Sequence, residues 1–369
     1  MTSDGPVRNA ISGGLFLSPV VQGRDLRVRL PYTVPPALAG LPFPTPAFAG
    51  RDAELACLTA LFTEQSGPRS PIVVEGPVGS GKTELVLKAA HQALARGGFP
   101  GGVLCADVSR VHGTALVGGF LRAMGVPAAR VPAGWAERSA LCATVLSSLA
   151  DNGRPLLIVL DDVADPGQLI DVLPAFSSAT TLVTTPVRLA VRAPHRLTVG
   201  ALPTADATLL LRRALAVSSP DDTRITDGPD AAVRLAALCD GLPLALRTAA
   251  ALLAESPRRP LAALVEDLAD PRTRLAELTH PDHDLRARLD ACHTRLDPSG
   301  AGLLWLLALR EEPETATRTL AALAGEPENT VRERLTGLLH LIEAGGTTPD
   351  SWRLSPLVRQ YVLSRRRPG

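Results

Sequence analysis

Gly76-Pro77-Val78-Gly79-Ser80-Gly81-Lys82-Thr83 follows the pattern G-x-x-x-x-G-K-[ST], which is that of a phosphate-binding loop, or P-loop. Residues 71–75 before it are mostly apolar and β-branched, which predicts a buried strand. Residues 83–95 after it place apolar side chains at helical spacing on one side. A strand, a glycine-rich loop and a helix in this order allow backbone N–H groups and a helix N-terminus to cradle a polyphosphate.

Two side chains of this loop have expected roles. Lys82 is expected to reach the β- and γ-phosphates of a nucleotide, and the Thr83 hydroxyl is expected to bind Mg²⁺. Lys82 and Lys88 are the only two lysines in the chain, which otherwise uses arginine as its cation. A lysine is suited to this position because its compact charge fits between phosphates. The alternative is a chance match in a glycine-rich turn, which the strand and helix on either side argue against.

A second motif places two acids at the end of a strand. Residues 155–160 are a continuous apolar run, typical of a strand buried on both faces of a parallel sheet, and Asp161 and Asp162 follow. Ligands bind at the carboxyl ends of such strands. We expect Asp161 to hold Mg²⁺ and Asp162 to polarise the attacking water, so that Asp162 and Lys82 are the expected catalytic residues. The alternative is a strand that ends in an ordinary polar turn.

The order of predicted elements divides the chain into four parts. Residues 1–47 are expected to be a flexible N-terminal segment with a Pro-rich linker. Strands alternate with helices over residues 48–200, which predicts a P-loop α/β domain with a doubly wound parallel sheet. Helices broken by Pro and Gly predict a helical bundle over 201–279. Helices, a Gly-Gly turn and a short strand, with a helix expected over 330–344, predict a winged-helix domain over 280–369.

Composition excludes several classes of protein. The net charge of +1 gives no basic field for nucleic acid. The five cysteines are scattered without C-x-x-C spacing, which argues against a disulfide framework or a zinc site. The N-terminus lacks a basic-then-apolar signal pattern, and the apolar runs are too short to span a bilayer. We therefore expect a cytoplasmic protein that has neither a membrane nor a nucleic acid as its partner.

The ordered motifs resemble one family, the NB-ARC branch of the STAND signalling NTPases, found in bacterial regulators and plant NLR receptors. The matching segments are residues 48–51, 76–83, 156–162, 184–185, 241–244 and 354–361. The resemblance implies that ATP or ADP binds with Mg²⁺ between the three folded domains, with Gly50, Arg51 and Pro243 lining the adenine site. The full nucleotide-binding set is Gly50, Arg51, Gly76, Gly79, Ser80, Gly81, Lys82, Thr83, Glu84, Thr185, Pro243 and Ser355, with Thr83 and Asp161 as metal ligands.

Two positions depart from the family's pattern. Pro186 stands where the family has an arginine that reads the γ-phosphate, and Arg188 is the nearest substitute. Ser355 stands where the family often has a histidine that touches the β-phosphate of ADP. Ser355 can donate a hydrogen bond but carries no charge. We therefore expect nucleotide binding with slow or no hydrolysis.

The N-terminal segment has two interpretations. Residues 11–23 resemble the short amyloid-signalling motifs at the N-termini of some bacterial NLR-like proteins, which implies contact with an effector protein. The alternative is a disordered tail, because glycines weaken strands and the segment could remain unfolded.

Two functions from different classes stay open at this point. The leading hypothesis is a molecular switch, closed with ADP and opened by ATP for self-association. The alternative is a DNA-binding transcriptional regulator, whose predicted recognition region mixes Arg332 and Arg334 with Glu333 and Glu343. That mixture is a poor surface for phosphates. A metabolic ATPase or kinase is disfavoured because the sequence shows no separate substrate site.

Overall fold

A computed structural model gives the fold of residues 37–64, 70–187, 189, 193–345 and 350–365. The segment that resembles amyloid-signalling motifs lies outside the described residues, and so does Arg188. What the sequence predicts for them therefore stays a prediction. Within the described ranges, no helix combines the length and the apolar character needed to cross a bilayer.

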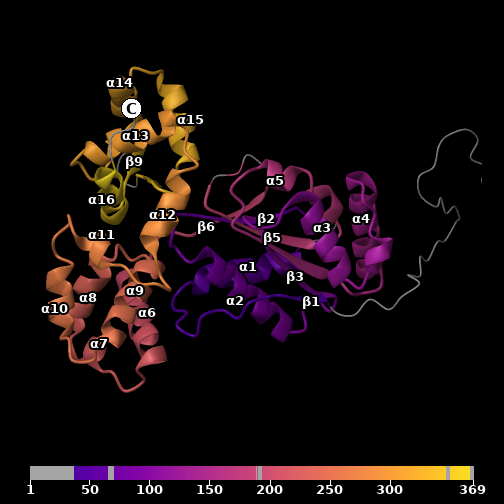
Figure 1. The fold of residues 1–369 in the computed structure, drawn as a ribbon, viewed down its shortest axis with the longest axis horizontal. Coiled ribbons are helices and arrows are strands. Elements are labelled where there is room, and N and C mark those ends of the chain that lie inside the picture. The colour runs from indigo at the N-terminus through magenta and orange to yellow at the C-terminus, as the bar shows by residue number, and fades with distance from the viewer. Residues whose placement is uncertain (1–36, 65–69, 188, 190–192, 346–349, 366–369) are drawn as a thin grey trace, which may run out of the picture.

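Six strands form a parallel sheet in the order β1-β3-β4-β5-β2-β6 (Figure 1). They are β1 (Ala37–Ala39), β2 (Ile72–Glu75), β3 (Gly102–Asp107), β4 (Leu156–Asp161), β5 (Thr180–Thr185) and β6 (His195–Thr198). The strand before the P-loop, β2, lies between β5 and β6. The loop and the ends of β4 and β5 therefore open at the same edge of the sheet, where ligands bind in parallel sheets.

The first strand differs from what the composition predicts. Residues 37–39 were expected in an extended linker, but Ala37 to Ala39 pair in parallel with Gly102 to Leu104 at the edge of the sheet. Pro-rich composition predicts an extended backbone, but it does not predict whether that backbone pairs with a neighbouring strand. Without β1, the outer edge of β3 would have backbone N–H and C=O groups without partners. An extended segment that passes close to this edge can pair with them and become a strand.

Helices cover both faces of the sheet because the side chains of a strand alternate between faces. In β4, Leu157 and Val159 share a core with apolar side chains of α1 and α2, whereas Ile158 and Leu160 share another with α3 and α4. Burial on both faces explains the continuous apolar run of this strand. The flanking helices are α1 (Asp52–Glu64), α2 (Lys82–Ala95), α3 (Gly113–Ala123), α4 (Trp135–Asp151) and the short α5 (Gly167–Ile170).

The chain after β6 is mainly helical. Its first helices are α6 (Thr204–Ser218), α7 (Arg224–Asp227), α8 (Pro229–Leu238), α9 (Pro243–Glu255), α10 (Leu261–Asp267) and α11 (Arg274–Glu277). The later helices are α12 (Leu285–His293), α13 (Pro298–Leu309), α14 (Thr317–Ala324), α15 (Glu328–Gly337) and α16 (Pro356–Ser364). A small antiparallel sheet, ordered β7-β9-β8, joins β7 (Thr315–Ala316), β8 (Glu343–Ala344) and β9 (Ser351–Arg353).

One buried apolar cluster connects these later helices. It extends from Leu202 before α6 to Val362 in α16, and it also includes Ala49 and Val78 from the N-terminal half. In Figure 1, α12 lies between the large sheet and the remaining C-terminal helices. The helix predicted over 330–344 is shorter than expected: α15 ends at Gly337, and β8 follows. The shared cluster places α12 where it can meet the P-loop.

Candidate functional site

A cleft of about 450 Å³ lies at the edge of the sheet where the P-loop opens. Its walls come from the P-loop, the ends of β4 and β5, helix α9 and helix α12. Some of the lining residues are apolar and others are charged. The apolar portion suits a flat base and the charged portion suits phosphates. The apolar lining includes Phe48, Ala49, Leu202, Leu210 and Leu244, and the charged lining includes Lys82, Asp161 and Asp162.

The P-loop backbone requires glycine. Gly76 has φ 154°, and a Cβ there would lie 2.1 Å from the carbonyl oxygen of Val199. Gly79 and Gly81 have φ of 80° and 86°, in the left-handed region that favours glycine. Between them, the buried Ser80 Oγ has no hydrogen-bond partner among the described residues. A glycine-shaped loop with an unsatisfied buried hydroxyl fits a ligand that brings hydrogen-bond acceptors, such as a phosphate.

Lys82 begins α2 inside this loop. Its Nζ donates to the carbonyl oxygens of Gly76 and Pro77, each at 2.9 Å. Burial lowers the pKa of Lys82 to about 8, although the carboxylate of Asp162 opposes that effect. The side chain is therefore still mainly charged at pH 7. Phosphate oxygens are stronger acceptors than these carbonyls, so the position of Lys82 fits a phosphate ligand.

The two acids at the end of β4 line the cleft together with the P-loop. Thr83 Oγ1 donates to Asp161 Oδ1 at 2.9 Å, and Thr184 Oγ1 also donates to Asp161. Burial raises the pKa of Asp161, while the bonds from Thr184 and Thr83 oppose the rise. Asp162 has φ 56°, unusual for a residue with a side chain, and its N–H donates to Thr184 Oγ1 at 2.9 Å. The strained backbone holds Asp162 beside Asp161.

A hydroxyl and a carboxylate this close fit a hard cation such as Mg²⁺, which takes oxygen ligands. In the part of the chain that the structure describes, no group of three or more His, Cys, Asp or Glu residues can hold a metal. Mg²⁺ commonly binds through one or two protein groups plus substrate phosphates. Thr83 and Asp161 therefore fit a cation that arrives with a nucleotide.

Arg51 and the first turn of α9 brace the P-loop. The Arg51 guanidinium donates to the carbonyl oxygens of Ser80, at 3.4 Å, and Gly200, and it pairs with Glu54 at 3.0 Å. Pro243 is the first residue of α9 and lines the cleft, and the next N–H, of Leu244, donates to the Gly79 carbonyl at 3.1 Å. Arg51 and Pro243 thus lie in the cleft wall, and their place at an adenine site stays a prediction.

Glu84 also lines the cleft, but its carboxylate is engaged within the protein. It accepts a hydrogen bond from the Thr45 N–H at 2.7 Å and lies 3.6 Å from the guanidinium of Arg247 on α9. Glu84 therefore connects α2 with α9 and with the segment before α1. Its position supports the walls of the cleft.

Four predicted site residues do not line the cleft. Gly50 and Gly76 shape the backbone beside it, and the Thr185 hydroxyl donates to the Val187 carbonyl at 2.7 Å while Thr184 faces the cleft instead. Ser355 lies elsewhere: its Oγ accepts from the Val358 N–H at 3.3 Å and caps α16. The serine in the family's histidine position is thus used as a helix cap.

Sequence reasoning missed the contribution of the C-terminal helices. Arg288, Ala291, Cys292 and Arg295 of α12 and its end line the cleft. Their spacing predicts a common helix face, but nothing local shows that this face meets the P-loop. The Val78 N–H of the P-loop also donates to the His340 carbonyl at 2.9 Å. The C-terminal part of the chain therefore contacts the loop directly.

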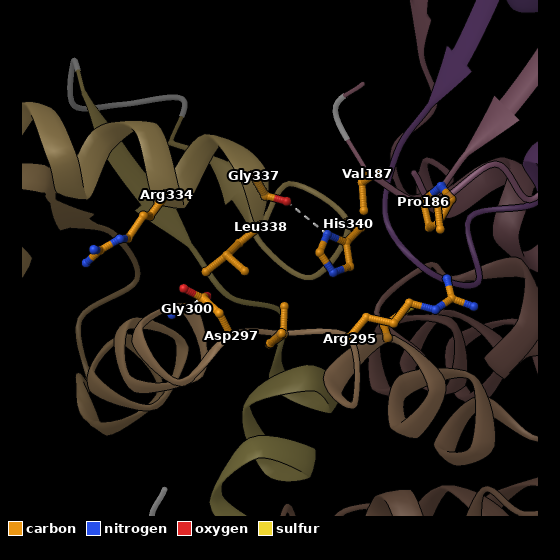
Figure 2. Close-up of a pocket in the computed structure, with 12 residues that line it drawn as sticks. Pro186, Val187, Arg295, Asp297, Gly300, Arg334, Gly337, Leu338 and His340 are labelled. Carbon is orange, nitrogen blue, oxygen red and sulfur yellow. Dashed lines mark hydrogen bonds between the residues drawn. The ribbon is translucent and has the colours of Figure 1, made fainter. Parts of the chain in front are cut away.

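A second cavity of about 410 Å³ adjoins the cleft and shares Pro186, Cys292 and Arg295 with it (Figure 2). His340 lines this cavity, and its Nδ1 lies 3.2 Å from the Gly337 carbonyl. Burial lowers the pKa of His340 to about 4. The imidazole is therefore neutral at pH 7, at the junction between the C-terminal part and the sheet.

One protein family and two curated relatives match this chain. Residues 47–191 match the AAA ATPase domain family. The regulatory protein AfsR of Streptomyces griseus is 31% identical over 331 residues, which cover 88% of this chain and 33% of AfsR. AfsR of Streptomyces coelicolor is 29% identical over 336 residues, again covering 88% of this chain and 33% of that protein. This chain thus spans about a third of the length of these relatives.

Among solved structures, a Walker-type ATPase of Pyrococcus abyssi is similar, with a TM-score of 0.57 over 86% of this chain and 96% of that one. Its sequence identity of 12% makes this a likeness of fold alone. Together the matches confirm the predicted parallel α/β P-loop ATPase fold and support a P-loop ATPase of the AfsR-like kind. The NB-ARC assignment, the helical bundle and the winged helix stay predictions.

Proposed function

We propose that this protein binds ADP or ATP with Mg²⁺ in the cleft and acts as a nucleotide-dependent regulatory switch of the NB-ARC type. The observation that carries the proposal is the origin of the cleft walls in three parts of the chain: the P-loop, α9 and α12. A nucleotide bound there contacts all three. Its phosphates can therefore bias how the three parts are arranged, provided that they contact the two arrangements differently.

Each polar residue has a proposed role. Lys82 and the P-loop N–H groups bind the β- and γ-phosphates, and Thr83 and Asp161 hold Mg²⁺. Mg²⁺, when bound, neutralises charge on the phosphates. Asp162 polarises the attacking water, and the apolar lining near Arg51 and Pro243 holds the adenine. The proposed domains are the P-loop domain (48–200), a helical bundle (201–279) and a winged helix (280–369).

Slow or absent hydrolysis is part of the proposal. Pro186 follows β5 where a cation would be expected to stabilise a transferring phosphate, and it carries no charge. Ser355 lies outside the cleft. With both charges missing from these two places, the site is better equipped to retain a nucleotide than to turn it over.

The regulatory role draws on the AfsR relatives, which are named regulatory proteins. By analogy, we propose that nucleotide exchange changes self-association of this chain. We further propose that residues 1–47 carry the signal to an effector protein. Both statements rest on relatedness and on the three-part cleft, and each needs its own test.

The central test denatures the purified protein and measures the identity and amount of the released nucleotide by ion-pair chromatography. We expect adenine nucleotide at close to one equivalent. Lys82→Ala should lose it, because the loop then lacks its phosphate-binding cation. Lys82→Arg should also lose most of it, since the planar guanidinium does not fit the same space.

Lys88→Arg is the matched control for this test. Lys88 is the chain's other lysine, lies on the same helix α2 and does not line the cleft. The same substitution there should leave the nucleotide content unchanged. Retention of nucleotide by both Lys82 variants would contradict the proposed site.

A further inference from the structure

We propose that Arg295 and Arg288 bind the terminal phosphate of the nucleotide and so distinguish ATP from ADP. Neither belongs to the P-loop half of the chain: both lie on the face of α12 and its continuation that lines the cleft. The inference rests on the proposed function, namely that an adenine nucleotide occupies the cleft. The inference adds to that function the two residues that distinguish a triphosphate from a diphosphate.

Helical spacing places both arginines on one face. Arg288, Cys292 and Arg295 are separated by four and three residues, and Thr294 between them keeps helical backbone angles. Cys292 is buried under this face, whereas both arginine side chains are exposed to the cleft. The face therefore presents two guanidinium groups over an apolar base.

Arg295 lines the same cleft as Pro186, the uncharged residue that stands where the family has an arginine. Arg295 and Pro186 line both the nucleotide cleft and the second cavity. Figure 2 shows the Arg295 side chain extending away from Asp297 toward the side on which Pro186 lies. Pro186 directly follows β5, the neighbour of the strand that leads into the P-loop. The cation of Arg295, just after α12, thus lines the cleft together with Pro186 at the end of β5.

Arg288 lies near the P-loop lysine. Lys82 and Arg288 both line the nucleotide cleft, and so does Cys292, which lies one helical turn beyond Arg288 on α12. Lys82 is the residue expected to bind the β- and γ-phosphates. A phosphate held by Lys82 would therefore lie in the same cleft as the Arg288 guanidinium.

Both guanidinium groups are available to a ligand. Within the described residues, neither Arg288 nor Arg295 makes a side-chain hydrogen bond or ion pair. The other arginines of the cleft differ, because Arg51, Arg110 and Arg247 each lie within ion-pair distance of a glutamate or aspartate. The lining holds six basic and four acidic side chains, an excess of two positive charges that suits a polyphosphate.

This arrangement has a consequence for the direction of the switch. Two unpaired arginines bind a triphosphate better than a diphosphate, because the added phosphate brings charge and oxygen acceptors to them. ATP, more than ADP, should then hold α12 against the P-loop. The sequence-based hypothesis gives the closed arrangement to ADP, and the charges of α12 favour the opposite assignment.

The test compares dissociation constants for ADP and for the non-hydrolysable analogue AMPPNP, both with Mg²⁺, by calorimetry on the full chain freed of nucleotide. In the double variant Arg288→Gln/Arg295→Gln, AMPPNP affinity should fall about 10- to 100-fold, from the loss of charge-assisted hydrogen bonds. ADP affinity should change by less than about 3-fold. Arg286→Gln is the control: Arg286 is exposed on the same helix but does not line the cleft.

The possible results are distinct. Equal losses for both nucleotides, or an unchanged AMPPNP affinity, would overturn the role of the arginines while leaving the nucleotide site intact. An unaltered protein that binds neither nucleotide would overturn the proposed function itself. Far-ultraviolet circular dichroism and the melting temperature of each variant show whether it is folded. If the double variant is unfolded, the single variants Arg295→Gln and Arg288→Gln are measured in its place.

Discussion

Gly76 is the P-loop glycine with the least room for a side chain. Its φ of 154° is outside the range that residues with a Cβ ordinarily adopt. A Cβ would also lie 2.1 Å from the backbone oxygen of Val199, which follows β6. The Val199 N–H donates to the Glu75 carbonyl at 2.8 Å, so this strand end cannot easily move away. The close approach therefore fixes glycine at the start of the P-loop.

Gly76→Ala should lower the free energy of unfolding by about 3 kcal/mol, from backbone strain combined with the clash at Val199. Gly97→Ala is the matched control, because Gly97 also has positive φ, of 78°, but has nothing within 4 Å of an added Cβ. That substitution should cost only about 1 kcal/mol. Urea unfolding measures both. Equal losses would show that φ alone, and not the approach of Val199, restricts the position.

The charged residues of the site show what sequence could and could not reveal. Lys82, Thr83, Asp161 and Asp162 were predicted because each belongs to a short motif whose spacing has a chemical reason. The structure brings all four into one cleft. Arg295 has no such motif. Its place in the cleft depends on how helices that are distant in the sequence pack together. A local sequence pattern does not predict that packing.

At the scale of elements, prediction was best where periodicity was strong. The strands β2 and β4 and helix α2 have the buried patterns that the sequence indicated. Strand β1 was missed because three residues of an edge strand carry no alternation to detect. Helix α15 ends earlier than expected, because the apolar residues after Gly337 belong to the turn that precedes β8.

Helix α15 is the element on which DNA recognition would depend. Arg332 pairs with Glu328 at 2.9 Å and with Asp350 at 2.6 Å. Arg334 pairs with Glu326. Arginines that already have carboxylate partners offer little free charge to DNA phosphates, which dominate the affinity of such complexes. The ion pairs of Arg332 and Arg334 are therefore an argument against α15 as a surface for DNA phosphates.

The N-terminal residues allow a test at the scale of an element. Removing residues 1–30 should leave nucleotide retention unchanged, because the cleft lining begins at Thr45. Removing residues 1–46 also deletes β1 and the Thr45 N–H that donates to Glu84 at 2.7 Å. This longer deletion should lower the free energy of unfolding by about 2 kcal/mol. Nucleotide content and urea unfolding measure the two effects, and loss of nucleotide in the shorter deletion would contradict this division of roles.

At the scale of the whole molecule, the C-terminal part, from α12 onward, contacts the P-loop region at two places. One is α12, which supplies Arg288 and Arg295 to the cleft. The other is the turn after α15, where the His340 carbonyl accepts the Val78 N–H at 2.9 Å. The imidazole of His340 is 4% exposed, and its pKa is also lowered by the positive charges of Lys82 and Arg295. This junction is therefore sensitive to the protonation of His340.

The free energy of unfolding should depend on pH through this histidine. Burial lowers the pKa of His340 to about 4, below the ordinary value of 6.5, so the folded protein favours the neutral ring. A group with a lowered folded pKa contributes stability that is present above pH 6.5 and is lost as pH falls toward 4. The full contribution is about 3 kcal/mol.

His340→Gln removes the titrating group and keeps a polar side chain of similar size. Between pH 7 and pH 4, the unaltered protein should therefore lose about 3 kcal/mol more unfolding free energy than the variant. Urea unfolding at half-unit pH steps measures the difference. His283 and His293 also have lowered pKa values, but they titrate in both proteins and cancel in the comparison. Parallel pH profiles would mean that protonation of His340 does not disturb the contact between the C-terminal part and the P-loop.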